Sequence, residues 1–443
     1  MGRFNPCELS DFARYYGFHY DGINSDALIK EILVEMERGL AGKTSSLPMI
    51  PSYITPVSGI PPGKTVLALD AGGTNLRASL VQFNEKGEAI AQGTKKLKMP
   101  GTSGRVSAQQ FFDEIADAAL PLLKEAKVEG IGFTFSYHTE ITSDADGIVI
   151  GMSKEVDAPD VTGKLLGKEL RNSLASKGFN YDGRIVILND TTATLLCGLT
   201  AISSGNENIP SSPVIGFILG TGCNTAYPET NIPKINFHSP SSPQIIVCES
   251  AALNIRCRGQ LDMEYDSTTK NAGEWLLEKA TSGAYLGPLT LHILKQAVRE
   301  KLIAFKKSGE LLAMPNLESK TLSDFLRTPF AAENPFGSLF GKDETDAIAA
   351  VQYISSIITE RGALLSAAVL AATVKKMNAG FEPYSPVRIA VEGTTYMMYN
   401  GMRCAIESHL HQMLNKENPR SYVIAPVEQA SLFGAAVAAL QGN

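Results

Sequence analysis

A glycine-rich segment near residue 70 combines residue types that suit phosphate binding. Between Val66 and Leu80, in VLALDAGGTNLRASL, two apolar strand-like runs flank Gly72-Gly73-Thr74-Asn75, which predicts a β-hairpin. The two glycines let backbone N–H groups approach a bulky anion, and Arg77 adds a planar cation. Asp70 beside an anion indicates a Mg²⁺ ion between them, bound to the carboxylate through water. The alternative for this window is a purely structural hairpin.

The same plan occurs a second time in the chain. The segment GFILGTGCNTAY, which begins at Gly216, contains an apolar strand, a Gly220-Thr221-Gly222 turn and a second strand, although the two segments share no close sequence repeat. Two units of similar ground plan, each directing one glycine-rich hairpin into a common cleft, would explain this recurrence.

Polar residues follow several predicted strands, where sheet proteins commonly place reactive groups. Asn189-Asp190 follow the strand RIVIL and begin a helix, Ser136 follows GIGFTF, and Ser153-Lys154 follow GIVIGM. Taken singly, Asp190 is typical of a helix N-cap, and the serines are typical of solvated loops. Their functional interpretation requires that they share a cleft with both glycine-rich turns.

Two carboxylates in the second half are further candidates. Glu249 ends the strand QIIVC and, taken alone, is typical of a solvated surface carboxylate. Glu278 lies one turn after Glu274 in a predicted helix, where an exposed face is the default position. Because Asn, Asp and Glu side chains bond readily to neighbouring hydroxyls, the set predicts a hydroxyl-rich ligand such as a sugar.

Hydrophobic periodicity predicts the elements that carry these residues. Ser25-Asp26 cap a predicted helix from Ala27 to Leu40, and five prolines from Pro48 to Pro62 predict an extended connector. Strands are expected near 65–70, 76–83, 88–98, 130–136, 147–151 and 184–188, with helices near 107–126 and 162–176. After Val214, strands are expected near 244–249, 387–392 and 421–425, and helices near 271–305, 343–377, 400–415 and 427–441. This order predicts an α/β fold with mixed sheets flanked by helices.

Composition limits the classes of protein to which the chain can belong. At 443 residues it is expected to form two domains. Six cysteines without a C-x-x-C pair indicate free thiols and a cytoplasmic location. A net charge of −6 without a basic block argues against nucleic acid as a partner. The apolar run Ala363–Val374 is too short to span a bilayer, so no membrane partner is expected. The sequence leaves the oligomeric state open between monomer and dimer.

Taken together, the ordered motifs resemble those of the hexokinase family of eukaryotic type, within the actin-like ATPase superfamily. LALDAGGTNLR and GTGCNTAY are similar to the two phosphate motifs of that family, and LNDTTATLL is similar to its catalytic Asn-Asp segment. GFTFS resembles the start of its sugar loop, and MSK resembles its Thr-Lys pair. CESAAL and NAGEWLLEKATSGAYLG keep the two sugar-binding glutamates, and VEGTTY resembles the adenosine motif.

The resemblance implies a two-domain actin-like (ribonuclease H-like) fold that closes on a sugar in the cleft between a small and a large domain. It implies an N-terminal helix and connector at 1–60 that pack on the large domain, a small domain at 61–200 with the helix near 428–443, and a large domain at 201–427. The implied reaction is ATP-dependent phosphorylation of a hexose, most often glucose, on its 6-hydroxyl, as in glycolysis. The implied roles are as follows: Asp190 as general base with Lys154 and Arg77 in catalysis; Ser136, Ser153, Lys154, Asn189, Asp190, Asn224, Glu249 and Glu278 for the sugar; and Asp70, Gly72, Gly73, Thr74, Asn75, Arg77, Gly220, Thr221, Gly222, Gly393 and Thr394 for Mg-ATP.

The sequence also departs from the family pattern near both substrates. Tyr137-His138 replace a Phe-Pro pair, Ser250-Ala251 replace Trp-Gly after the sugar glutamate, and Glu392 replaces the adenosine Asp. Ala284 replaces a frequent nucleotide-side Lys, which predicts weaker nucleotide binding unless the hydroxyl groups of Thr394 and Thr395 compensate or Lys279 reaches the site. An actin-like or chaperone-like ATPase and a catalytically weak sugar sensor are the alternative functions. The sugar-side residues argue against the ATPase, and the retained base and arginine argue against the sensor.

Overall fold

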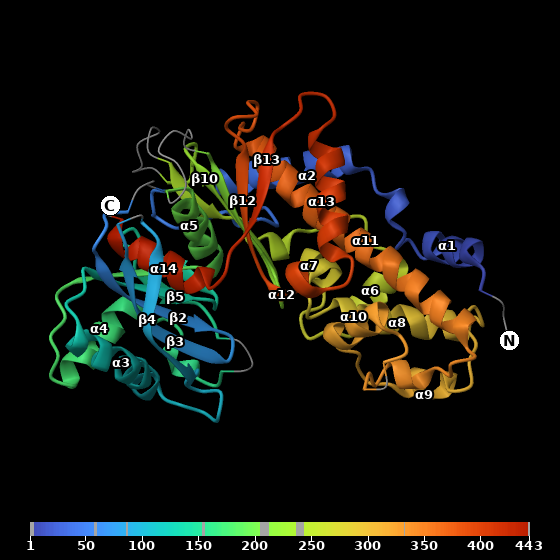
Figure 1. Cartoon of the computed structure of the whole chain (residues 1–443), viewed down its shortest axis with the longest axis horizontal. Helices are drawn as coiled ribbons and strands as arrows, with labels where there is room; N and C mark the ends of the chain where they lie inside the picture. Colours follow the sequence, from blue (N-terminus) through green and yellow to red (C-terminus); the bar gives the residue numbers. More distant parts are fainter. Residues whose placement is uncertain are drawn as a thin grey trace.

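Two β-sheets form the framework of the chain (Figure 1). The computed structural model describes residues 4–56, 60–85, 87–152, 156–203, 212–235, 243–331 and 333–441. In spatial order, the first sheet contains β4 (Ala89–Lys98), β3 (Asn75–Phe83), β2 (Thr65–Gly72), β5 (Gly130–Phe135) and β8 (Arg184–Leu188). The second contains β1 (Ile50–Pro51), β11 (Gln244–Val247), β10 (Cys223–Glu229), β9 (Val214–Leu219), β12 (Val387–Glu392) and β13 (Tyr422–Pro426).

Apart from β1, the two sheets have the same topology. The first three strands pair antiparallel in each sheet, as β4-β3-β2 and as β11-β10-β9. The next two strands of each sheet are parallel to its hairpin strand β2 or β9. The predicted repetition of the ground plan is therefore confirmed at the level of strand order, and mixed sheets flanked by helices are confirmed as the fold class.

Some predicted strands differ from those observed. The strand expected at 147–151 is β7 (Gly147–Val149), which pairs with β6 (Thr139–Ile141) in a separate two-stranded ribbon. The strand expected at 244–249 ends at Val247. The proline-rich connector contains β1, which extends the second sheet because Ile50 and Pro51 pair with β11.

Alternation along β2 determines which residues face the second sheet. Leu67 and Leu69 pack in a hydrophobic cluster with α3 (Ala108–Glu125) and α4 (Leu166–Ser176). Val66 and Ala68 pack in a different cluster, with α5 (Asp190–Ser203), α14 (Ala430–Leu440) and residues of the second sheet. Because side chains on a strand alternate between faces, Asp70 shares the second face and points toward the other unit.

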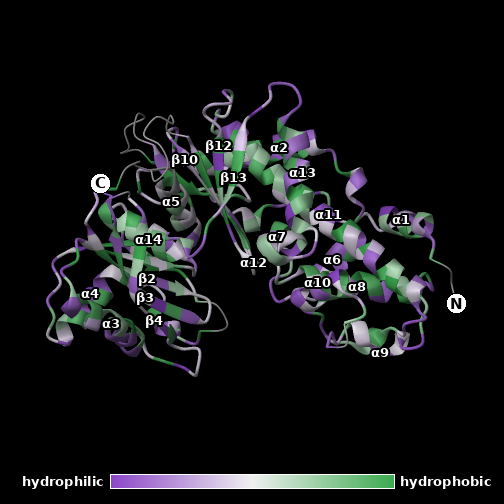
Figure 2. Cartoon of the chain, in the orientation of Figure 1, coloured by the Kyte–Doolittle hydropathy of each residue, from purple (hydrophilic) through white to green (hydrophobic). Residues whose placement is uncertain are grey.

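The C-terminal helix α14 returns to the first sheet and lies between this sheet and α5 (Figure 1). Its close approach needs glycine in β5, since a Cβ on Gly132 would lie 1.8 Å from the carbonyl oxygen of Ala435. Figure 2 shows hydrophobic residues along the central strands and on α14, which agrees with the apolar cluster between the sheets.

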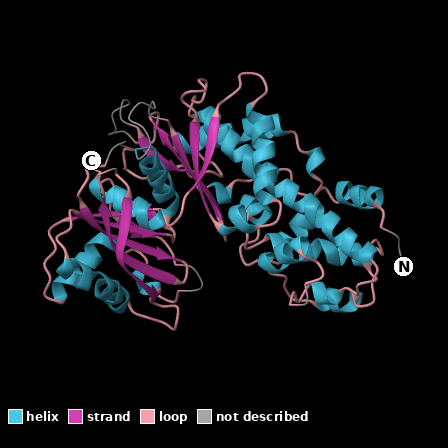
Figure 3. Cartoon of the chain, in the orientation of Figure 1, coloured by secondary structure: helices cyan, strands magenta, loops and turns pink. Residues whose placement is uncertain are grey.

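The second unit carries a large helical body (Figure 3). Its helices are α1 (Pro6–Tyr15), α2 (Ser25–Leu40), α6 (Gln260–Ser267), α7 (Leu276–Thr281), α8 (Leu286–Arg299), α9 (Ser308–Ala313), α10 (Ser319–Arg327), α11 (Thr345–Lys376), α12 (Thr394–Met398) and α13 (Met402–Leu414). The predicted helix at 271–305 is wrong in its extent, since it is divided into α7 and α8. The predicted cap of α2 is also wrong, because the Asn24 side chain accepts the hydrogen bond from Ala27 N.

Helix α11 forms the centre of this helical body. Among the described helices it is the one whose length and composition would allow it to cross a membrane, but 94% of its most apolar window is buried inside the protein. The buried helix predicted from Ala363–Val374 is therefore confirmed as a core helix.

Candidate functional site

Residues from both units line one cavity of about 620 Å³. The first unit contributes the segment after β5 and the start of α5, and the second unit contributes β10, the end of β11 and α7. Six predicted sugar-side residues are among its lining: Ser136, Asn189, Asp190, Asn224, Glu249 and Glu278. The other two predicted sugar-side residues, Ser153 and Lys154, lie outside the described residues.

Asp190 is available for chemistry because its neighbour caps the helix. The Asn189 Oδ1 atom accepts a hydrogen bond from Thr191 N at 2.8 Å, so Asn189 is the N-cap of α5 and the N-cap interpretation of Asp190 is wrong. Ser136 and Thr191 instead donate side-chain hydrogen bonds to the Asp190 carboxylate. Burial raises the pKa of Asp190 above its ordinary value, and these hydrogen bonds oppose that increase.

Glu249 follows β11, has an unusual backbone conformation, and accepts a hydrogen bond from the side-chain amide of Asn224. Its φ of 54° is left-handed, a conformation that a non-glycine residue adopts only where the surroundings require it. The Asn224 amide donates to Glu249 Oε1 at 2.9 Å, while Asn224 Oδ1 accepts from Thr225 N at 2.8 Å and Ser250 N at 3.2 Å. The amide orientation of Asn224 is thus fixed from both sides. Burial raises the pKa of Glu249.

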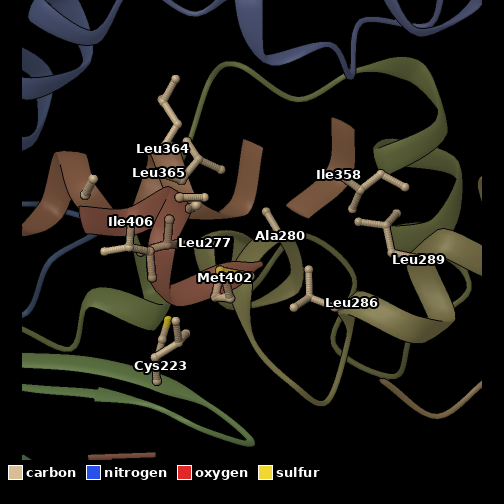
Figure 4. Close-up of a cluster of buried hydrophobic side chains, with 14 of the residues drawn as sticks. Cys223, Leu277, Ala280, Leu286, Leu289, Ile358, Leu364, Leu365, Met402 and Ile406 are labelled. Carbon is tan, nitrogen blue, oxygen red and sulfur yellow. The ribbon is translucent and has the colours of Figure 1, made fainter. Parts of the chain in front are cut away.

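Glu278 projects from α7 into the cavity, so an exposed helix face is wrong for this residue. The opposite side of α7 is buried in a hydrophobic cluster where Leu277 and Ala280 lie near Met402 (Figure 4). Glu278 Oε2 lies 3.4 Å from Cys223 N and would lie 2.6 Å from a Cβ on Gly222. Burial, opposed by the hydrogen bond from Cys223 N, raises the pKa of Glu278 to about 7.

The first glycine-rich segment forms the predicted hairpin. The ladder of β2 and β3 continues to the Gly72–Asn75 pair, so Gly73 and Thr74 form an exposed two-residue turn. Arg77 pairs with Asp70 at 3.5 Å across the same strands. Burial raises the pKa of Asp70 to about 6 despite the opposing effect of Arg77.

The second glycine-rich turn is held by two other segments. The carbonyl oxygen of Gly220 accepts hydrogen bonds from Gly283 N at 2.8 Å and from Thr395 Oγ1 at 2.7 Å. Gly393 has a φ of 125°, and a Cβ there would lie 2.3 Å from the carbonyl oxygen of Leu219. Thr221 and Thr394 are exposed beside this contact, so both remain accessible to a ligand.

Glu392, from the second unit, lies close enough to Asp190 and Asp70 of the first unit for their charges to affect it. Burial, followed by the charges of Asp190 and Asp70, raises the pKa of Glu392 to about 7, while Arg77 opposes the shift. The end of β12 therefore lies within electrostatic range of the first hairpin and of Asp190. In the sequence, Glu392 stood out only as a departure from the family motif. The clustering of carboxylates with raised pKa values favours a cationic or hydrogen-bond-donating ligand.

The structure contradicts one expectation about the nucleotide side. Lys279 cannot replace the cation missing at Ala284, because it is 5% exposed and its ammonium group bonds to Asp266 and to the carbonyl oxygen of Asn271. Sequence reasoning also missed several residues that line the cavity, namely Ser52, Asn271, Trp275 and Tyr285. Trp275 has a left-handed φ of 55°, a feature that is visible only in three dimensions.

Magnesium fits the donor chemistry of this region when phosphate supplies most of the ligands. Among the described residues, no three His, Cys, Asp or Glu side chains are grouped so that they could hold a metal ion. Mg²⁺ commonly binds one or two carboxylates together with water and substrate phosphates. Asp70, on the face that points toward the other unit, is the residue placed for such a contact.

Comparison with known proteins gives matches along almost the whole chain. Two family models described as hexokinase match residues 15–199 and 214–441. The chain is 30% identical over 435 residues to hexokinase-1 of Schizosaccharomyces pombe, covering 92% of this chain and 86% of the relative. It is 27% identical to hexokinase-2 of Candida albicans, covering 93% of this chain and 88% of the relative.

A solved structure shows the same fold. The hexokinase from Schistosoma mansoni complexed with glucose matches with a TM-score of 0.78 and 22% sequence identity. The match covers 99% of this chain and 100% of the schistosome chain.

Proposed function

We propose that this chain, which belongs to the hexokinase family and is therefore a sugar kinase, transfers the γ-phosphoryl group of ATP to the 6-hydroxyl of a hexose, principally glucose. The observation that carries the proposal is the single cavity in which Asp190 lies together with Asn224, Glu249 and Glu278. These side chains come from both units, and their number and type suit a ligand with several hydroxyl groups.

Asp190 is proposed as the general base. Phosphoryl transfer to an alcohol depends on positioning and on charge stabilisation, with a carboxylate accepting the hydroxyl proton. Burial raises the pKa of Asp190, which makes its carboxylate a stronger base. The hydroxyl group of Ser136 restricts the orientation of that carboxylate, because it donates a hydrogen bond to it.

The remaining polar groups are proposed to divide between the two substrates. Glu249, oriented by Asn224, and Glu278 accept hydrogen bonds from sugar hydroxyls, whereas the two glycine-rich turns and Arg77 bind the triphosphate. Asp70 would hold Mg²⁺ through water, and the ion would neutralise phosphate charge. Because the cavity takes residues from both units, sugar binding should draw the units together and exclude water, which would otherwise accept the phosphoryl group.

The two sheets are proposed to define two domains of a cytoplasmic protein. The first sheet with α14 is proposed as the small domain, and the second sheet with its helical body as the large domain. All six cysteines are free, which supports a cytoplasmic location.

Hexose-dependent release of ADP tests the proposal. Glucose, mannose, fructose and deoxy sugars are compared in a coupled assay, and the position of phosphate on the product is determined by NMR. Glucose should be converted to its 6-phosphate with one ADP per sugar. Deoxy sugars lacking a hydroxyl bonded to Glu249 or Glu278 should react poorly, since these carboxylates would remain unpaired.

Matched variants show whether the cavity is responsible. Glu249→Gln and Glu278→Gln should raise the KM for glucose, while Glu274→Gln, an exposed carboxylate outside the cavity lining, should not. ATP turnover that is independent of any hexose would instead support the ATPase alternative. Glucose binding without turnover would support a sensor.

A further inference from the structure

Tyr137 connects the segment after β5 with the turn between β2 and β3. Its hydroxyl group donates a hydrogen bond to the carbonyl oxygen of Gly73. Its ring packs against Phe135 with the ring centroids 4.9 Å apart, and the residue is 7% exposed. Tyr137 also lines the cavity, next to Ser136. One buried side chain therefore contacts both the sugar-side cavity and the first glycine-rich turn.

The hydrogen bond from Tyr137 to the Gly73 carbonyl group also determines the direction of the Thr74 N–H. The carbonyl group that Tyr137 binds belongs to the peptide between Gly73 and Thr74, and no cis peptide occurs among the described residues. In a trans peptide the C=O and N–H bonds point in opposite directions. The hydrogen bond from Tyr137 therefore directs the Thr74 N–H away from the segment after β5.

The turn is open on the side of Gly73. Gly73 has a φ of 49°, and no described heavy atom outside its chain neighbours lies within 4 Å of the position of its missing Cβ. On the other side of the turn, Met99 N donates to the carbonyl oxygen of Thr74 at 2.9 Å. The Tyr137 hydroxyl thus acts directly on the peptide that carries the Thr74 N–H.

We propose that Tyr137 is a positioning residue that orients the Thr74 N–H toward the phosphate of the nucleotide and makes this orientation depend on the sugar-side segment. The inference rests on the proposed function, because it requires the first turn to bind phosphate. Sugar that contacts Ser136 acts on the residue next to Tyr137, so sugar occupancy and phosphate affinity are linked through one hydroxyl group.

The variant Tyr137→Phe removes this hydroxyl and keeps the ring that packs on Phe135. Nucleotide affinity should fall about three- to tenfold, which is the effect of losing one neutral hydrogen bond, while glucose affinity measured without nucleotide stays within about twofold. Saturating glucose should also increase nucleotide affinity less in the variant than in the original protein. Both effects are measured by calorimetric titration with Mg²⁺ and the non-hydrolysable analogue AMPPNP, with and without glucose.

Tyr181→Phe is the matched control. Tyr181 is also buried in the first unit, and its hydroxyl donates to the carbonyl oxygen of Arg184 at 3.3 Å, but the residue does not line the cavity. This control should leave AMPPNP affinity unchanged. Equal AMPPNP affinity in Tyr137→Phe and the original protein, an equal loss in Tyr181→Phe, or a parallel loss of glucose and AMPPNP affinity would each overturn the inference. Absence of hexose phosphorylation in the original protein would contradict the proposed function instead, since the titration does not require turnover.

Discussion

The two glycine-rich turns occupy equivalent positions in sheets of the same strand order, but they are restrained differently. The β2–β3 turn is exposed, and Gly73 has free space around its missing Cβ. In the β9–β10 turn, Gly220 is bonded to Gly283 and Thr395, and Gly222 lies against Glu278. Hydrogen bonds from Tyr137 and Met99 N hold the backbone of the first turn but leave its outer side open to a ligand, whereas the second turn is packed against other segments and is part of the sugar-side wall.

Among substitutions in the two turns, Gly222→Ala should raise the KM for glucose the most. The new Cβ would lie 2.6 Å from Glu278 Oε2, so the carboxylate must move out of its position in the cavity. Loss of a charge-assisted hydrogen bond to sugar costs about 1.5–3 kcal/mol, so the KM for glucose should rise roughly ten- to hundredfold. Because only the end of a flexible side chain is displaced, the melting temperature should change little. An unchanged KM would show that Glu278 is not a sugar ligand.

The buried carboxyl groups predict a pH dependence of intermediate size. Burial raises the pKa of Glu278 from its ordinary 4.5 to about 7, so between these values the folded protein binds more protons than the unfolded chain. The stabilisation from this group is complete below about pH 4.5 and is lost as the pH rises through about 7. The free energy of unfolding of the sugar-free protein should therefore decrease between pH 5 and pH 8.

Glu278→Gln is the variant that tests this pH dependence. It should make the decrease shallower without abolishing it, because the raised pKa values of Asp70 and Glu392 act in the same direction. Urea unfolding at several pH values measures the slope. Glucose affinity should rise over the same pH range, since the ionised carboxylate is the better acceptor for sugar hydroxyls. A slope that is identical in the variant would exclude Glu278 as its source.

Gly73→Ala should have the smallest effect and is the counterpart of Gly222→Ala. No described atom outside the chain neighbours would contact the new Cβ, and the cost arises from the φ of 49°, about 1 kcal/mol for a non-glycine residue. The free energy of unfolding should fall by about that amount, with the KM for glucose unchanged. A large increase in the glucose KM would show that the two turns do not differ as described.

Local sequence patterns are sufficient to predict the site residues that stand next to a strand in the sequence. The hairpin around Gly72-Gly73 is encoded in adjacent residues, and Asp190 was found because it follows a buried strand. The two similar sheets were predicted from the repeated strand–turn–strand plan. These features depend on hydrophobic periodicity and on the residue types of turns, both of which can be recognised in a single sequence.

Other features depend on contacts between distant segments. Glu278 lies on a helix that is shorter than the amphipathic pattern predicts, and its carboxylate lies against Gly222 and Cys223, more than fifty residues earlier in the chain. Lys279 is removed from the nucleotide side by Asp266, thirteen residues earlier in the chain. The capping of α5 by Asn189 rather than Asp190 could not be resolved because both residue types cap helices well.

Asp190→Asn tests the central claim most directly, that the Asp190 carboxylate, in the cavity lined by both units, accepts the proton of a sugar hydroxyl. The amide keeps the shape and the hydrogen-bonding capacity of the side chain but cannot accept the proton, so kcat should fall by about 10²-fold or more. Glucose affinity, measured by calorimetric titration, should remain within a few fold of the original value. Near-normal turnover in Asp190→Asn would contradict the account, because the residue would then serve only to shape the start of α5.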